Sequence, residues 1–532
     1  MSAQDTQLNT LLSSAIEAHQ QGRLAEASDL YAKLLKIVPQ HPDATHLNGL
    51  IAFQSNDFVK AKTLIKRAIT YDAFNALYHA NLGRVCMAMR DTVAACDAWG
   101  HALTIEPNAA DVHSDLAGAL LKLEKYKDAL QHADQALVLQ TRHPQALINK
   151  ALAHNNLGNA ERDQMRLDDA VFNYIQALEV APNESDIHSN LGVAYQEMGN
   201  AAKAISCYQK AIKLDSENAE AHRNLGMAHL QMGAFDMGWE EYEWRWKTNH
   251  FAPLVRNWSK PRWQGQNAKN KTLLVHCEQG FGDTLQFARY LPLAAQKVKK
   301  LIVEAPKELA ELLSRMAGVD EVIVDGMPLE NVDFQIPMLS LPHVFKTTLN
   351  TIPSIVPYLH PVKNKAQVWS DRLAKKEGEV LVGLAWKGSK AHQRNVLRSL
   401  ELISVQDLFG IDQRLRFVSL QKEGGASDID SYSWAEKILD LTAELKTFDD
   451  TAALVSNLDI VVTPDTAIAH LSGGLDVQTV LMLPFVSEWR WLEQRSDSPW
   501  YPNTKLIRQH EHGSWVEAVA EVKHILMNTF DI

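Results

Sequence analysis

The chain has 532 residues, of which 46% are hydrophobic and 22% charged, and its formal net charge is -11 at pH 7. A chain of this length exceeds what one hydrophobic core supports, so we expect two to four domains. The ordinary composition excludes a chain that is disordered throughout, and the acidic balance argues against nucleic acid as the main partner.

No segment of the sequence predicts export or membrane insertion. The first ten residues, MSAQDTQLNT, hold no basic stretch leading into an apolar signal segment, and no run approaches about 18 apolar residues. The cysteines show neither CxxC nor zinc spacing, so we expect reduced thiols. We therefore predict a cytoplasmic protein. The cysteines are Cys86, Cys96, Cys207 and Cys277.

Small residues recur every 34 positions in the first half of the chain. This period is typical of tetratricopeptide repeats, which are helix pairs that stack into a superhelix with a long inner groove. We predict about seven repeats over residues 8–250, with a seven-residue insertion near 158–165 that lengthens the helices of one repeat. The series is Ala15, Gly49, Gly83, Ala117 and Ala151, and then Gly192 and Gly226.

A polar side chain stands two positions before most of these small residues. An amide repeated on successive first helices can donate to and accept from an extended peptide, so this ladder is predicted to bind a polypeptide acceptor. The alternative is a solvated polar position beside a buried Leu or Ala. The spacing resembles the asparagine ladder of the protein O-GlcNAc transferases. The ladder residues are Asn81, Asp115, Asn149, Asn190 and Asn224.

The repeat pattern ends in an aromatic run, FDMGWEEYEWRW, at residues 235–246. We interpret this run as packing the last repeat onto the next domain. Residues 251–270 lack any period and contain Pro253, Pro261 and Gly265, so they are predicted to be a linker.

Strands then alternate with helices, which predicts a parallel, doubly wound sheet over residues 271–360. The expected strands are TLLVHCE, LIVEA and EVIV, with helices over 285–295 and 307–316. The turn Gly280-Phe281-Gly282-Asp283 follows the first strand, where such sheets place ligands. Asp283 is a candidate general base, and the alternative is that it only caps the following helix.

A second sheet of the same type is predicted over residues 361–532, giving a cleft between two halves. Its expected strands are VLVGL, RFVSLQKE, ILDLT, DIVVTPD, VQTVLMLP and TKLIRQ, and its last helix spans 514–527. No DxD motif follows a strand in this half, and Asp449-Asp450 opens a helix instead, so no metal is expected. The Trp-rich segment EWRWLEQRSDSPWYP, at residues 488–502, is expected to close a wall of the cleft.

The stretch from Asp459 to Leu475, DIVVTPDTAIAHLSGGL, combines a buried strand, a sharp turn and the start of a helix. Asp465 and Thr466 stand where a helix needs oxygens for its unpaired N–H groups, and Ala467 is small enough for close approach. Thr466 and His470 share one helix face. The stretch predicts a phosphate-binding helix end, and the alternative is an ordinary strand-to-helix crossing capped by Asp465.

A basic loop follows the first strand of the second half, and its cations suit phosphate oxygens. As an alternative, each is a solvated residue of an exposed loop. Gln421, after the next strand, is a further candidate contact to the base or phosphate of a nucleotide. The loop cations are Lys387, Lys390, His392, Arg394 and Arg398.

Together these pieces resemble the bacterial glycosyltransferases that fuse tetratricopeptide repeats to a GT-B domain of the heptosyltransferase-like family. The specific marks are GFGDT at 280–284, Leu397-Arg398-Ser399, PDTAIAHLSGG at 464–474 and SPWYP at 498–502. The resemblance implies a GT-B fold of two Rossmann-like domains, Asp283 as base, and a donor site at the glycine turn and the 464–474 segment. The implied donor-binding residues are Gly280, Gly282, Lys387, Arg398, Ser399, Gln421, Asp465, Thr466, Ala467 and His470.

The resemblance implies an inverting, metal-independent protein O-glycosyltransferase without a resident cofactor. Its co-substrate would be a nucleotide sugar. Members closest in layout transfer a nonulosonic acid, such as pseudaminic acid from a CMP-linked donor, to flagellin held by the repeats. Two alternatives stay open: a repeat adaptor or chaperone with a non-catalytic nucleotide-sugar domain, and transfer to a glycan or lipid.

Overall fold

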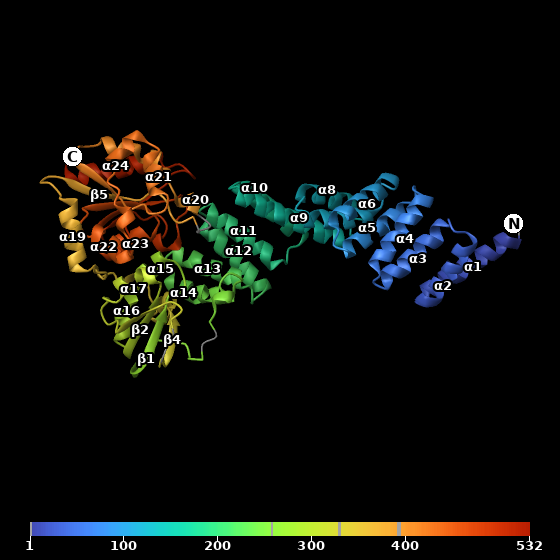
Figure 1. Cartoon of the computed structure of the whole chain (residues 1–532), viewed down its shortest axis with the longest axis horizontal. Helices are drawn as coiled ribbons and strands as arrows, with labels where there is room; N and C mark the ends of the chain where they lie inside the picture. Colours follow the sequence, from blue (N-terminus) through green and yellow to red (C-terminus); the bar gives the residue numbers. More distant parts are fainter. Residues whose placement is uncertain (1–2, 257–258, 328–330, 391–394) are drawn as a thin grey trace. The chain divides into compact units, whose positions relative to one another are not determined.

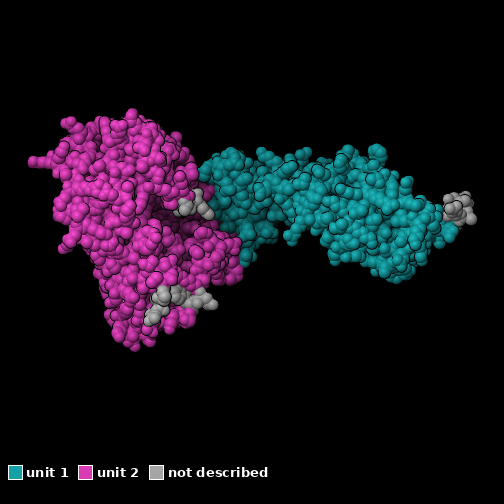
Figure 2. Space-filling model, in the orientation of Figure 1, with its two compact units in different colours: residues 1–194, 213–215 teal, residues 195–212, 216–532 magenta. Residues whose placement is uncertain are grey.

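The computed structural model describes residues 3–256, 259–327, 331–390 and 395–532. The chain divides into two compact units, coloured separately in Figure 2. Unit 1 comprises residues 1–194 and 213–215, and unit 2 comprises residues 195–212 and 216–532. The dividing point falls inside the sixth repeat, upstream of the end of the repeats that the sequence predicts at residue 250.

Among the described residues, the helices before residue 243 come in seven pairs, and the sequence predicts about seven repeats. Figure 1 shows the pairs of unit 1 side by side along the array. The pairs are α1 (Ala3–Gln20) and α2 (Leu24–Ile37), α3 (Pro42–Gln54) and α4 (Phe58–Tyr71), α5 (Ala76–Ala88) and α6 (Thr92–Ile105), α7 (Ala110–Lys122) and α8 (Tyr126–Leu139), α9 (Pro144–Asp163) and α10 (Leu167–Val180), α11 (Ser185–Glu197) and α12 (Ala201–Leu214), and α13 (Ala219–Gln231) and α14 (Phe235–Tyr242).

The recurring small residues lie where the two helices of a pair touch. A Cβ placed on Gly83 would come within 2.5 Å of the Trp99 ring, and one on Gly49 within 2.9 Å of Ile65. At these two positions only glycine lets the helices approach this closely. The 34-residue period therefore marks the contact between paired helices, as predicted.

The seven-residue insertion lengthens a single helix. Helix α9 has 20 residues, whereas α10 keeps the 14 residues of the other second helices. A Cβ on Gly158 would come within 2.6 Å of Tyr174, so Gly158 makes the contact within the pair in this repeat. The extra two turns thus precede Gly158, and the predicted insertion at 158–165 was placed a few residues too late.

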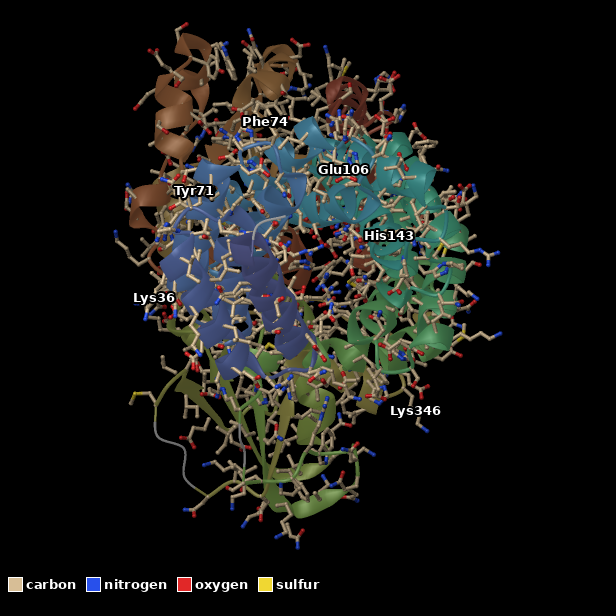
Figure 3. All side chains as sticks on the ribbon, turned by 90° about the vertical axis from the view of Figure 1, so that its right-hand side faces the viewer. Lys36, Tyr71, Phe74, Glu106, His143 and Lys346 are labelled. Atoms are coloured by element: carbon tan, nitrogen blue, oxygen red, sulfur yellow. The ribbon has the colours of Figure 1, made fainter. Side chains whose placement is uncertain are left out.

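Unit 1 is curved along its length. In Figure 3, viewed along the array, residues at or near the ends of successive second helices follow an arc from Lys36 through Tyr71 and Glu106 to His143. An arc of this kind is what a small rotation between neighbouring repeats produces.

Unit 2 contains two parallel sheets, which confirms the predicted α/β class of this region. In the described residues, the first sheet has the order β3-β2-β1-β4 and the second has the order β6-β5-β7-β8-β9. All neighbouring strands run parallel. The strands are β1 (Ala268–His276), β2 (Val298–Ala305), β3 (Glu321–Val324), β4 (Phe334–Pro337), β5 (Val380–Leu384), β6 (Leu415–Ser419), β7 (Ile460–Pro464), β8 (Gln478–Leu483) and β9 (Thr504–Arg508).

Two strand predictions were wrong. Strand β4 was not predicted, because only four residues enter the ladder with β1. Conversely, ILDLT at 438–442 is not a strand: Leu439 makes a single bridge to Val418 and the chain then turns. Residues 261–263 cover the outer edge of β4, since Trp263 N donates to Gln335 O at 2.9 Å.

The helices of unit 2 connect and cover the sheets, as Figure 1 shows for α16 and α17 and for α19, α22 and α23. The helix predicted over 285–295 begins earlier, at Phe281, and is interrupted by a 3-10 turn at Ala288–Tyr290. Asp449 and Asp450 open α22, as predicted. The helices are α15 (Phe281–Phe287), α16 (Leu291–Ala295), α17 (Lys307–Leu313), α18 (Leu341–Val344), α19 (Lys363–Leu373), α20 (Asn395–Arg398), α21 (Gly425–Asp430), α22 (Phe448–Val455), α23 (Ala467–Gly474) and α24 (Val516–Phe530).

The aromatic run after the last repeat packs against the α/β part of unit 2, as predicted. Trp239 is edge-on to Trp489 at 5.3 Å between ring centroids, and its indole donates to Thr347 O at 3.0 Å. The last repeat and both sheets thus share one core. In the part of the chain that the structure describes, no helix is both long and apolar enough to cross a bilayer.

Candidate active site

The turn after β1 is fixed by a one-sided cap at the start of α15. Gly280 occupies the N-cap, and its backbone N–H donates to Oδ2 of Asp283 at 3.1 Å. A glycine has no side chain to accept from the helix. The Asp283 carboxylate instead reaches back and accepts from the backbone N–H of Gly280. The capping alternative for Asp283 is therefore observed, and it leaves Oδ1 for a second partner.

The turn after β7 places a second helix start at the carboxyl edge of the other sheet. Thr466 is the N-cap of α23, with Oγ1 accepting from Ile468 N at 3.3 Å. Asp465 does not share this role. Its side chain is buried at the end of the strand, where the carboxylate has little contact with water.

These two turns are in direct contact within unit 2. A Cβ on Gly282 would lie 2.9 Å from Cδ2 of His470 and 3.6 Å from Cα of Ala467. The glycine of GFGD is thus needed for the start of α15 to lie against the start of α23. The structure brings together Gly280, Gly282, Asp283, Asp465, Thr466, Ala467 and His470, as predicted from two sequence segments about 180 residues apart.

His470 is held inside this contact. Its Nδ1 lies 2.9 Å from the hydroxyl of Tyr501, and its ring stacks on Trp491 at 5.2 Å between centroids. Burial, together with the nearby Arg490, moves the pKa of His470 well below its ordinary value, so the ring is neutral. His470 therefore braces the helix start, and its bond to Tyr501 explains why the SPWYP segment accompanies the 464–474 segment.

Arg490 joins the two turns and was not predicted. It lies in the 3-10 turn Trp489–Trp491, and its guanidinium pairs with Asp283 and donates from Nε to Oε1 of Gln286 at 2.9 Å. Its remaining amino group lies 3.4 Å from Oε2 of Glu488. Burial opposes its charge, but Asp283 and Glu488 outweigh burial and raise the pKa of Arg490.

Asp465 completes a cluster of three carboxylates and two arginines. Burial and the neighbouring Glu488 raise the pKa of Asp465 to about 6, although Arg398 and Arg490 act in the opposite direction. Among the residues that the structure describes, the Nε of Arg398 has no hydrogen-bond partner. An arginine donor without an acceptor, next to a helix start, is an arrangement that suits an anionic oxygen.

The other predicted donor contacts are engaged within the fold. Lys387 Nζ lies 2.9 Å from Asp428, and Gln421 accepts from the backbone N–H of Lys387 at 2.8 Å. Ser399 accepts from Gly388 N at 3.1 Å and so shapes the loop. These side chains position the carboxyl edge of β5 and β6. His392 and Arg394 lie outside the described residues.

Glu278, after β1, is a second residue that sequence reasoning missed. Its Oε1 accepts from Leu339 N at 3.1 Å and from Arg245 at 3.3 Å, while Oε2 has no partner in the described parts of the chain. Burial raises the pKa of Glu278 to about 7 despite Arg245, and Asp283 adds to the rise. The signal in the sequence was a lone carboxylate directly after a buried strand. For Arg490 it was a lone cation within the aromatic segment EWRW.

The predicted acceptor ladder is largely bonded within the array. Asn149 Nδ2 donates to Ser114 O at 2.8 Å, Asn81 Nδ2 donates to Nε2 of His46 at 3.0 Å, and both asparagines are buried. Asn190 Nδ2 donates to Asn155 Oδ1 at 3.0 Å. Each bond joins residues 35 apart, so these amides tie one first helix to the preceding one.

Asp115 and Asn224 make weaker or more exposed contacts. Asp115 accepts from Arg84 at 3.1 Å and remains partly exposed. Asn224, in unit 2, is buried and accepts only a long contact of 3.5 Å from Arg223. Of the ladder residues, Asp115 and Asn190 are the two with partly exposed side chains.

Comparisons with known proteins agree with the repeat array. The family described as "TPR repeat" matches residues 158–199 and 197–233, and the family described as "Tetratricopeptide repeat" matches residues 18–85. Protein FlbA of Caulobacter vibrioides is 24% identical over 96% of this chain and 88% of its own length. A DnaJ homolog subfamily C member 7 homolog of Dictyostelium discoideum is 23% identical over 30% of this chain and 32% of its own length.

Solved structures with a similar array include YrrB, described as a TPR protein with an unusual peptide-binding site. It is 22% identical, with a TM-score of 0.31 over 36% of this chain and 95% of its own. MamA is 19% identical, with a TM-score of 0.28 over 34% of this chain and 94% of its own. The family matches show that the chain contains tetratricopeptide repeats, and the chain is similar along nearly its whole length to Protein FlbA.

Proposed function

We propose that this protein is an inverting, metal-independent glycosyltransferase that moves a sugar from a nucleotide donor to a Ser or Thr hydroxyl of a protein. Flagellin is the acceptor that the resemblance to flagellin-modifying enzymes favours, and a CMP-linked nonulosonic acid is the corresponding donor. The two parallel sheets of unit 2 are the halves of a GT-B domain, and the tetratricopeptide repeats bind the acceptor protein.

The observation that carries the proposal is the contact between the starts of α15 and α23. Both helices follow the carboxyl ends of parallel strands, where open sheets bind ligands. Through this contact the helix that carries Asp283 begins next to the helix that Thr466 caps. Arg398 acts on the charge of Asp465 next to Thr466, and among the described residues its Nε has no hydrogen-bond partner. An acid next to an anion-binding helix end is what transfer from a sugar phosphate requires.

In the proposed reaction the acceptor hydroxyl gives its proton to Asp283 as its oxygen bonds to the anomeric carbon. The bond from that carbon to the phosphate oxygen breaks, and the nucleotide leaves with the electron pair. The N–H groups at the start of α23 and the Arg398 guanidinium stabilise the charge on the leaving phosphate. Removing a single donor of this kind typically slows a reaction by about 10²- to 10³-fold.

The acceptor would lie along the curved array, with the partly exposed Asp115 and Asn190 as its polar contacts. The buried Asn81 and Asn149 support this surface by joining neighbouring repeats. An array of this kind binds protein chains through extended backbone or helical segments, which fits an acceptor that is itself a folded or partly folded protein.

The proposal is tested by expressing the full chain with and without flagellin in cells that make the nucleotide sugar, and measuring intact flagellin mass. Wild type should add the mass of one or more sugars. Asp283→Asn should lose at least about 10²-fold in transfer, because an amide cannot take the proton. Retained capture of flagellin by the variant shows that it is folded. Normal transfer by Asp283→Asn would contradict the assignment.

A repeat adaptor with a non-catalytic nucleotide-sugar domain is the second candidate. The specific observation in its favour is that both oxygens of Asp283 are occupied, one by Gly280 N and the other by Arg490. An adaptor would bind nucleotide and flagellin saturably and leave the mass of flagellin unchanged. Transfer to a glycan or lipid would likewise leave flagellin unmodified but would consume the donor.

A further inference from the structure

Arg490 is paired with Asp283, so any catalytic role of Asp283 depends on this pair. The residue is only 8% exposed, and its N–H groups point to Asp283, Gln286 and Glu488. The guanidinium also lies over the ring of Trp489, with Cζ 4.5 Å from the ring centroid. Packing on Trp489 and the bond from Nε therefore hold the stem of the guanidinium, while one of its amino groups pairs with Asp283.

Both oxygens of Asp283 already have a partner. Oδ2 receives the N–H of Gly280 at 3.1 Å, and Oδ1 receives the guanidinium of Arg490. Taking a proton from an incoming hydroxyl at Oδ1 would end the charge-assisted bond to Arg490, because a protonated carboxyl carries no charge to pair with the guanidinium. The bond to Gly280 belongs to the helix cap, so the bond to Arg490 is the one to displace.

Arg490 also acts electrostatically on the donor end of the site, because the start of α15, which carries Asp283, lies against the start of α23. Asp465, next to the N-cap Thr466, is close enough to Arg490 for each to affect the charge of the other. Arg398 acts on the same carboxylate. An anionic phosphate that binds at the start of α23 would thus be a stronger partner for the guanidinium than one shared carboxylate.

We propose that Arg490 is a positioning residue that Asp283 and the donor phosphate share. Donor binding draws the guanidinium to the phosphate and so frees Oδ1 of Asp283 for the acceptor hydroxyl. This inference rests on the proposed function. It adds that the empty enzyme holds its base in an ion pair, and that the phosphate of the co-substrate releases it.

The same contact balances the charge of the transfer step. The proton moves from the acceptor hydroxyl to Oδ1, the hydroxyl oxygen bonds to the anomeric carbon, and the nucleotide phosphate departs with the electrons of the broken bond. As Asp283 loses its negative charge the phosphate gains one, and Arg490 remains the counter-ion throughout. After nucleotide release and loss of the proton from Asp283, the original pair forms again.

The experiment is a double-mutant cycle on nucleotide binding to the full chain, measured by calorimetry with CMP, UDP, ADP and GDP as probes. Arg490→Gln should weaken binding of the preferred nucleotide by about tenfold or more, because a charge-assisted bond to phosphate is lost. Asp283→Asn should tighten binding by severalfold, because the phosphate no longer competes for Arg490. In the Arg490→Gln background, Asp283→Asn should have no effect on affinity.

The cycle separates this role from a structural one and from simple charge repulsion. A structural role for Arg490 would lower affinity in both single variants. Repulsion between Asp283 and phosphate would tighten binding equally in both backgrounds, and either result overturns the inference. Arg495→Gln, a partly exposed arginine of the same segment paired with Asp497, is the matched control and should bind as wild type does.

Arg490→Lys keeps the charge if Arg490→Gln does not fold, and it should bind nucleotide with intermediate affinity. A Lys ammonium makes one directed contact where the guanidinium fork makes several. Circular dichroism and thermal melting establish folding of each variant. Failure of all four nucleotides to bind wild type would contradict the proposed function and this inference together. Normal binding without coupling would contradict only the inference.

Discussion

Asp465 is a carboxylate that the fold stabilises better with a proton than without one. It is 6% exposed, and Glu488 adds a second negative charge nearby, so its pKa rises to about 6 from an ordinary value of 3.8. Arg398 and Arg490 reduce the rise without cancelling it. Ionisation of a buried acid such as Asp465 lowers the stability of the folded chain. Such a group is typical of a site where a bound ligand changes the balance of charge around the acid.

The raised pKa predicts a pH-dependent stability. Between about pH 4 and 6 folded Asp465 keeps a proton that the unfolded chain has lost, so the free energy of unfolding falls as pH rises through this window and levels off above it. The full effect is on the order of 3 kcal/mol for a two-unit shift. The side chain in Asp465→Asn does not ionise, so this pH-dependent contribution to stability is absent from the variant.

We therefore expect the melting temperature of Asp465→Asn relative to wild type to increase from pH 4 to pH 6 and then stay constant. Tryptophan fluorescence during thermal unfolding measures it, since Trp491 and Trp500 are buried in unit 2. Asp371→Asn, at an exposed position of α19, should show no such trend. A difference that is independent of pH would contradict the assignment of a proton to Asp465.

At this scale the sequence predicted the residues whose roles follow from local chain geometry. Thr466 and Asp283 stand at helix starts directly after strands, and spacing alone shows this. Arg490 and Glu278 could not be found in this way, because their importance comes from partners far along the chain: Asp283 and Arg245. A lone charge in an apolar segment is an ambiguous signal until its partner is known.

At the scale of elements, the repeat helices depend on a few contacts that admit no side chain. Gly83 of α5 faces the ring of Trp99 of α6, and the Trp99 indole donates to Ala80 O at 3.0 Å. The ring is therefore held by a hydrogen bond and cannot move aside easily. The period of the small residues was readable in the sequence because each repeat needs this close approach once.

Gly83→Ala should destabilise its repeat by about 1–3 kcal/mol, because the new Cβ would meet the Trp99 ring at 2.5 Å. Gly100→Ala is the matched control: it lies in α6, nothing lies within 4 Å of its Cβ, and it should stabilise the helix by about 0.5–1 kcal/mol. Hydrogen exchange of the α5 and α6 amides measures both. Equal protection in the two variants would show that the helices can separate without cost.

Short elements were the least predictable. β4 offers four residues, and its place beside β1 is set by tertiary pairing, with residues 261–263 on its other side. ILDLT has the composition of a strand, but it pairs with β6 in a single bridge only. The N–H groups of Leu439 and Ser419 make the hydrogen bonds of that bridge. Strand propensity reflects packing more than backbone preference, so tertiary context decides such cases.

At the scale of the whole molecule, the chain is not divided where its repeats end. The last repeat belongs to unit 2, where Phe235 stacks near Trp500 at 5.9 Å and Trp239 packs on Trp489. The change of period near residue 250 predicts the end of the repeats but not the boundary of the compact unit. A core shared between the last repeat and both sheets makes this part of unit 2 a single body that fixes the candidate site.

A substitution of Gly282 tests whether the close contact between the starts of α15 and α23 is required at the candidate site. Gly282→Ala would place a Cβ 2.9 Å from His470, which Tyr501 and Trp491 hold in place, so the starts of α15 and α23 must move apart. We expect nucleotide affinity and transfer to fall by about tenfold or more, since small displacements of reacting groups cost that much. Gly410→Ala, where nothing lies within 4 Å of the added Cβ, should leave both unchanged. Unchanged transfer by Gly282→Ala, with hydrogen exchange in the repeats as in wild type, would mean that the chemistry does not occur where these helices meet.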